Sequence, residues 1–250
     1  MTSAPPLFEA RQLHKRFGHR VVLEDISLAF EEGTLTGIMG PNGAGKTTCF
    51  NVLTGAFAPD RGTVLLDGED ITGLPPQAIT RRGVARSFQT INLFDAEAAQ
   101  DNVVMALPAV RERASDPWND LARDSGAQDQ AAALLARVGL KGRERTRARD
   151  LSYGERRSLE IALALATAPR ILFLDEPTSG LGADGTARLA ELVAELKRRY
   201  TIVMIEHDMR FLFGLADVVN VIHWGQVIAR GTPAELREDA WVRRSSLAAA

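Results

Sequence analysis

The feature that most constrains this chain is a glycine-rich loop at residues 40–48, which reads GPNGAGKTT. An apolar, strand-like run at residues 35–39 precedes the loop, and a helix-like run at residues 47–53 follows it. In that context backbone N–H groups turn inward around an anion, and the following helix adds its positive N-terminal end. The loop therefore predicts a site for a nucleoside triphosphate.

The loop contains the full pattern G-x-x-x-x-G-K-[ST]. Lys46 offers a point charge to the outer phosphates, and the Thr47 hydroxyl can hold Mg²⁺. A glycine-rich turn that matches by chance is the alternative, and the strand–loop–helix context argues against it. The expected nucleotide-binding residues are Gly40, Pro41, Asn42, Gly43, Ala44, Gly45, Lys46, Thr47 and Thr48.

Length and composition exclude several classes of protein. A chain of 250 residues suits one large α/β domain, and a net charge of -2 gives no support to a nucleic-acid partner. The single Cys49 cannot form an internal disulfide and is expected to be a buried thiol. No signal peptide is visible, and the most apolar runs are far shorter than the ~20 residues of a membrane span. We expect a soluble, cytoplasmic protein that meets a membrane only through partners.

Hydrophobic periodicity predicts an α/β fold: a P-loop NTPase core with a parallel sheet, an N-terminal antiparallel β subdomain and an inserted helical subdomain. Residues 7–30 alternate like two antiparallel strands, and residues 84–88 look like a further strand. The helical insertion covers about residues 95–165 and includes an exposed loop at 111–126. The remaining helices and strands are expected at residues 63–66, 75–82, 128–138, 152–168, 171–174, 184–199, 201–205, 217–224 and 226–230.

Two adjacent acids, Asp175 and Glu176, follow the apolar strand at residues 171–174. The carboxyl end of such a strand delivers them to the sheet edge where ligands of α/β proteins bind. Asp175 can complete the Mg²⁺ shell with Thr47, and Glu176 can polarise an attacking water. A strand that ends in an acidic turn without a function is the alternative, and the presence of a phosphate-binding loop in the same chain argues against it.

The segment LSYGE at residues 151–155 is a good helix start, because Ser152 and Glu155 have the spacing of a capping box. A helix N-terminus with a serine hydroxyl and a glycine, Gly154, is also a candidate anion site. Taken alone, the residues favour the capping box, and the anion site is the alternative.

The order of these motifs resembles that of ABC-type ATP-binding cassettes. The phosphate-binding loop, LSYGE and ILFLDEPTSG follow one another, and His207 stands after the strand TIVMIE. The resemblance covers Leu7 to about Leu236. The family's signature is usually written LSGGQ, so Tyr153 and Glu155 are departures within the variation that the family shows.

The resemblance implies ATP and Mg²⁺ as cofactors and assigns further roles. Phe17 resembles the aromatic platform for adenine, although such a residue is otherwise core or surface filler. Gln89 resembles the glutamine that touches Mg²⁺ beside the membrane subunit, and His207 resembles the histidine that contacts the γ-phosphate and holds water with Glu176. The implied catalytic residues are Glu176, His207 and Gln89; the metal ligands are Thr47, Gln89 and Asp175; and Ser152 and Gly154 cover the nucleotide of a second cassette.

The resemblance also implies an ATPase subunit of an importer, peripheral on the inner face of the cell membrane through transmembrane permease subunits. Residues 86–94 are similar to the group that serves branched-chain amino-acid importers, and urea or amide importers look alike. Leu93 and Phe94 are expected to line the groove that receives a cytoplasmic permease helix. A non-transport ABC ATPase and a P-loop kinase are the rivals. We expect one domain at residues 1–240 and a tail at 241–250.

One departure concerns the partner. After residues 175–178 the family usually continues S-x-L-D or S-x-L-N, whereas this chain places Gly182 at the last position. In a head-to-tail dimer each such loop serves the opposite site, and branched-chain amino-acid systems pair two different cassettes. We therefore expect a second cassette that is a different chain.

Overall fold

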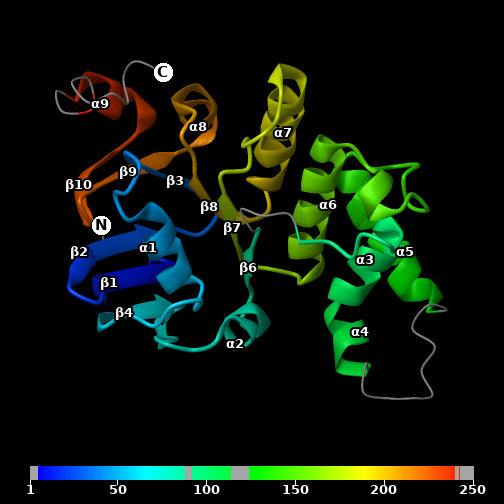
Figure 1. Cartoon of the computed structure of the whole chain (residues 1–250), viewed down its shortest axis with the longest axis horizontal. Coiled ribbons are helices and arrows are strands. Elements are labelled where there is room, and N and C mark those ends of the chain that lie inside the picture. Colours follow the sequence, from blue (N-terminus) through cyan, green and yellow to red (C-terminus); the bar gives the residue numbers. More distant parts are fainter. Residues whose placement is uncertain (1–4, 88–91, 114–123, 240–241, 243–250) are drawn as a thin grey trace.

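The computed structural model of the protein describes residues 5–87, 92–113, 124–239 and Val242. Its centre is a six-stranded sheet in which every neighbouring pair is parallel except the edge pair at the C-terminal end of the chain. The strands are β3 (Leu35–Met39), β6 (Val84–Arg86), β7 (Ile171–Asp175), β8 (Thr201–Ile205), β9 (Val218–His223) and β10 (Gln226–Gly231). Their order is β10-β9-β3-β8-β7-β6 (Figure 1).

A second, antiparallel sheet is formed mainly by the N-terminal part of the chain. It contains β1 (Phe8–Phe17), β2 (Arg20–Phe30), β4 (Arg61–Leu66) and β5 (Glu69–Asp70), in the order β2-β1-β4-β5. The predicted antiparallel pair at residues 7–30 is confirmed, with Phe8 opposite Phe30 and Phe17 opposite Arg20. Helix α1 (Lys46–Leu53) lies beside this sheet (Figure 1).

The inner strands β3, β8 and β7 of the six-stranded sheet are buried on both faces. Successive side chains of a strand point to opposite faces, so Leu172 and Leu174 join one hydrophobic core while Ile171 and Phe173 join the other. The second core holds an aromatic cluster, in which the ring of Phe173 lies 5.4 Å from that of Phe8. A sheet covered on both sides needs continuous apolar strands, which is why residues 171–174 show no alternation.

Helices cover the sheet, and several of them form a separate group to one side of it. Helices α3 (Ala99–Ala106), α4 (Pro108–Arg113), α5 (Ser125–Arg137) and α6 (Tyr153–Ala166) gather at one end of the molecule (Figure 1). None of the helices in the described part of the chain is long and apolar enough to cross a membrane. The remaining helices are α2 (Pro76–Arg81), α7 (Ala183–Leu196), α8 (Met209–Leu215), α9 (Pro233–Glu238) and the 3₁₀ turn η2 (Ala148–Asp150).

The structure corrects the predicted boundaries in the helical part. The expected loop at residues 111–126 is too long, because α4 extends to Arg113 and α5 already begins at Ser125. The physical reason is a cap: the Asp124 carboxylate accepts a hydrogen bond of 3.1 Å from the backbone N–H of Ala127. Strand β6 ends at Arg86, and the end of the strand expected at 84–88 lies outside the described residues, as does the tail apart from Val242.

Candidate functional site

The carboxyl ends of the parallel strands meet at one edge of the large sheet, and polar residues follow them, some of them predicted from the sequence. The phosphate-binding loop follows β3, and Ser87 follows β6. Glu176 comes directly after β7, and Glu206 and His207 come directly after β8. Four segments that are far apart in the sequence therefore supply one site.

The phosphate-binding loop depends on glycine where the chain passes close to its neighbours. Gly40 has a φ of 155°, and a Cβ atom there would lie 2.0 Å from the carbonyl oxygen of Ile222 on β9. Gly45 caps the N-terminus of α1 with a φ of 103°. The first N–H groups of α1 face the loop without a capping side chain, so an anion is a suitable partner for them.

Lys46 is buried inside the loop. Its Nζ donates hydrogen bonds of 2.8 Å to the carbonyl oxygen of Gly40 and 3.0 Å to that of Pro41. Burial lowers the pKa of this amine, while the nearby carboxylates of Glu176 and Asp175 act in the opposite direction. The ammonium group is therefore held where the outer phosphates of a nucleotide would arrive.

Asp175 has the character of a cation ligand. Its buried carboxylate accepts a hydrogen bond of 2.7 Å at Oδ2 from the Arg86 guanidinium, whereas Oδ1 finds no hydrogen-bond partner among the described residues. Burial raises the pKa of this carboxyl, and Arg86 counteracts the rise. A buried oxygen without a donor fits Mg²⁺, which prefers carboxylate, hydroxyl, phosphate and water oxygens. The exposed Thr47 is the hydroxyl ligand that the sequence predicts.

Glu176 and His207 are brought together from two strand ends. His207 Nε2 lies 2.8 Å from Glu176 Oε1, a contact whose donor depends on the imidazole tautomer. The backbone of Glu176 is left-handed, with a φ of 45°, and its N–H donates to the carbonyl oxygen of Ile205 on β8. A carboxylate and an imidazole in contact can hold and orient one water molecule.

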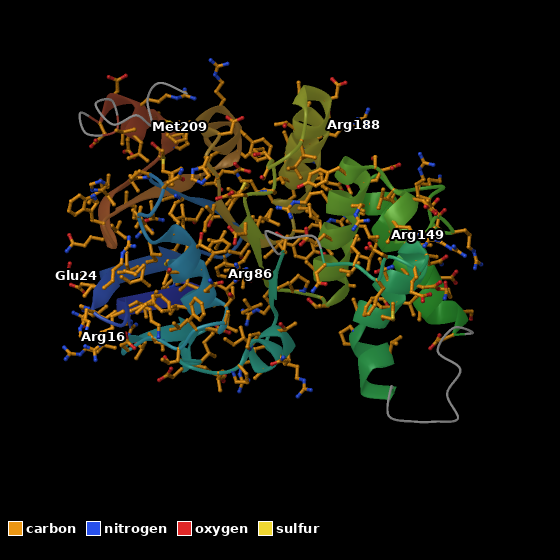
Figure 2. The ribbon with its side chains drawn as sticks, viewed as in Figure 1. Arg16, Glu24, Arg86, Arg149, Arg188 and Met209 are labelled. Carbon is orange, nitrogen blue, oxygen red and sulfur yellow. The ribbon has the colours of Figure 1, made fainter. Side chains whose placement is uncertain are left out.

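Two charged residues that the sequence analysis assigned no role complete the site. Arg86 lies in the middle of the molecule (Figure 2), and besides Asp175 it binds Asn51 Oδ1 on α1 at 2.6 Å. The buried Glu206 accepts hydrogen bonds from the backbone N–H groups of Thr178, at 2.8 Å, and His207, at 3.0 Å. The signal for each was its position directly at the carboxyl end of a buried strand.

Three predicted residues lie apart from this edge. The Phe17 ring is 46% exposed and packs edge-on against Phe57 at 5.4 Å, so it is not core filler. Ser152 and Glu155 form the expected capping box at the start of α6. No hydrogen bond or ion pair within the described residues joins Phe17, Ser152 or Gly154 to the phosphate-binding loop. Gln89 lies outside the described part of the chain.

Comparison with known proteins places this arrangement in a family. A family model described as ABC transporter matches residues 23–179, which is more than half of the chain. The chain is 39% identical to the high-affinity branched-chain amino acid transport ATP-binding protein LivG of Salmonella typhimurium, over 97% of this chain and 98% of that one. It is 35% identical to the lipopolysaccharide export system ATP-binding protein LptB of Acidithiobacillus ferridurans, over 95% of each chain.

Solved structures give the same answer. The chain superposes with a TM-score of 0.84 and 27% identity on an ATP-binding cassette of an ABC transporter in its ADP conformation, over 96% of this chain and 97% of that one. A nucleotide-free cassette gives a TM-score of 0.83, also at 27% identity, over 95% and 97% of the two chains. The protein therefore belongs to the ABC transporter family, as one of its ATP-binding cassettes and thus an ATPase.

Proposed function

We propose that this chain is the ATP-hydrolysing subunit of an importer and powers the uptake of branched-chain amino acids through partner permeases. The observation that carries the chemistry is the Glu176–His207 contact beside the phosphate-binding loop. The substrate class is supported by LivG and by BraF of Pseudomonas aeruginosa, which is 37% identical and also named for branched-chain amino acid transport. A urea or amide importer ATPase and a non-transport ABC ATPase are the alternatives.

The nucleotide is held by the loop at residues 40–48. When phosphates enter, the Lys46 ammonium exchanges the carbonyl oxygens of Gly40 and Pro41 for phosphate oxygens, which carry a full negative charge. The Thr47 hydroxyl and the Asp175 carboxylate, with Gln89, would hold Mg²⁺. Bound there, Mg²⁺ would supply positive charge that offsets the charge of the phosphates. The exposed Phe17 stacks on adenine.

Hydrolysis needs a water that is placed in line with the γ-phosphate. Glu176 takes the role of the general base, and His207 holds the carboxylate in place through the 2.8 Å contact and faces the γ-phosphate. Glu206 holds the segment after β7 and the segment after β8 together, because its carboxylate accepts hydrogen bonds from the backbone N–H groups of Thr178 and His207. The α6 N-terminus, with Ser152 and Gly154, closes over the nucleotide held by a second cassette.

The assembly follows from these roles. Residues 1–240 form one ATP-binding domain, in which about residues 95–165 act as a helical subdomain, and residues 241–250 are a tail. The chain lies on the cytoplasmic face of the cell membrane, bound to permease subunits and to a second cassette of a different chain. Nucleic acid is not a partner.

Reconstitution tests the proposal. The complete complex is placed in lipid vesicles with ATP enclosed on the cassette side, and uptake of radiolabelled leucine and urea is measured in parallel. We expect ATP-dependent uptake of leucine and none from a complex that carries Lys46→Ala. Uptake of urea in place of leucine would favour the alternative importer, and ATP hydrolysis without uptake of either solute would contradict the proposal.

A further inference from the structure

The N-terminal part of α6 contacts the backbone at the end of β7 and just after it. Arg157 is almost completely buried, and its guanidinium donates to the carbonyl oxygens of Asp175 at 2.8 Å, Glu176 at 3.0 Å and Pro177 at 3.4 Å. The guanidinium is itself anchored by Glu160 at 2.6 Å. One helical turn before Arg157, and so on the same face of the helix, stands Tyr153.

Tyr153 extends this contact along the segment. Its hydroxyl donates a hydrogen bond of 3.1 Å to the carbonyl oxygen of Ser179. Its ring lies against Gly180, where an added Cβ would be 2.8 Å from Tyr153 Cε1. Gly180 also has a φ of 78°, so both the backbone and the ring require glycine at this position. Side chains of α6 thus bind four carbonyl oxygens between Asp175 and Ser179.

The segment needs such support because Glu176 has a left-handed backbone with a φ of 45°. A non-glycine residue in that region is strained and persists only where its surroundings hold it. Glu206, which follows β8, holds the same segment by accepting a hydrogen bond from the backbone N–H of Thr178. These contacts hold the backbone at Glu176 and on both sides of it.

We propose that Tyr153 is a positioning residue for Glu176. By binding Ser179 and covering Gly180, it fixes residues 177–182 and so keeps the Glu176 carboxylate against His207 Nε2. A displacement of the α6 N-terminus would then move residues 177–182 and with them the carboxylate of Glu176, the proposed base. The catalytic consequence rests on the proposed function, whereas the effect on the backbone does not.

The first test measures backbone amide exchange in the nucleotide-free protein. Tyr153→Phe keeps the ring and removes only the hydroxyl, and because Tyr153 is 47% exposed this change leaves the core intact. Loss of one hydrogen bond is expected to speed exchange of the Ser179 and Leu181 amides roughly fivefold. The matched control is Tyr200→Phe, which removes the chain's other tyrosine hydroxyl and its contact with Arg137, and leaves these amides unchanged.

A second pair of variants tests whether a side chain at Gly180 disturbs residues 177–182 more than a side chain at the same φ elsewhere in the chain. Gly180→Ala and Gly139→Ala place a side chain at nearly the same φ, 78° and 79°, but only the first meets the Tyr153 ring. Both are expected to lower the melting temperature, and only Gly180→Ala is expected to speed exchange at residues 177–182. Equal exchange in the two variants would overturn the packing part of the proposal.

Steady-state kinetics in the complete complex supply the catalytic readout. Tyr153→Phe is expected to lower kcat several-fold while the KM for ATP stays constant, because a base is misplaced and no nucleotide contact is lost. A raised KM with kcat retained would show that Tyr153 binds nucleotide, and unchanged amide exchange would likewise overturn the proposal. If the parent complex hydrolysed no ATP, the proposed function would fail, and the exchange comparison would still decide the role of Tyr153.

Discussion

Glu176 is the residue on which the proposed chemistry depends, since it contacts His207 and follows Asp175, the proposed cation ligand. Glu176→Gln keeps the size of the side chain and removes its basicity, so ATP binding should persist. Turnover should fall by ~10²–10⁴, which corresponds to about 3–5 kcal/mol of barrier. Phosphate release by purified complex measures the rate, and Glu69→Gln on the exposed strand β5 is the control. Turnover above half of the parent rate would contradict the assignment.

At the scale of an element, the two apolar side chains in the short segment after residues 88–91 differ in how far they are exposed to solvent. Leu93 packs against the core on the helical side, whereas the Phe94 ring is 58% exposed. The expectation that both line a docking groove is therefore revised towards Phe94. Its backbone is held in place by Asn102, which accepts from its N–H at 2.8 Å and donates to its carbonyl oxygen at 3.1 Å. A cavity of about 340 Å³, lined in part by Arg86 and Asn92, lies nearby.

Two single variants test this division. Phe94→Ser is expected to keep the melting temperature and the basal ATPase rate, and to abolish uptake and membrane association, because an exposed aromatic ring is lost from a docking surface. Leu93→Ser is expected to lower the melting temperature, because it removes partly buried apolar surface. Flotation of vesicles with bound cassette measures association. Uptake at the parent level in the Phe94→Ser complex would rule out its docking role.

At the scale of the whole molecule, Gly182 bears on which partner the chain needs. Gly182 is the N-cap of α7 and has an extended backbone, and nothing in the described part of the chain lies within 4 Å of a Cβ placed there. Packing therefore does not require glycine at this position. A different partner cassette can supply the missing carboxylate or amide at one of the two sites. We expect the purified complex to contain two different cassettes, counted by native mass spectrometry. Two copies of this chain and no second ATPase would refute the heterodimer.

Local patterns were enough to predict the phosphate-binding loop, the capping box at Ser152 and the buried strand that ends in Asp175 and Glu176. Each depends on neighbours within a few residues, where periodicity and backbone hydrogen bonding act directly. The pairing of His207 with Glu176 required more: it was implied by resemblance to a family, because the two residues come from different strands.

Other features were decided only by the tertiary structure. Arg86 and Arg157 look like ordinary charged residues in the sequence. In the structure Arg86 binds the Asp175 carboxylate, and Arg157 binds the carbonyl oxygens of residues 175–177. The burial of Leu93 and of Glu206 likewise depends on which elements pack beside them. Such partners are distant along the chain and meet only when the strands align and the helices close over the sheet. A position at the end of a buried strand marks Arg86 and Glu206 in the sequence, but it does not say which groups they bind.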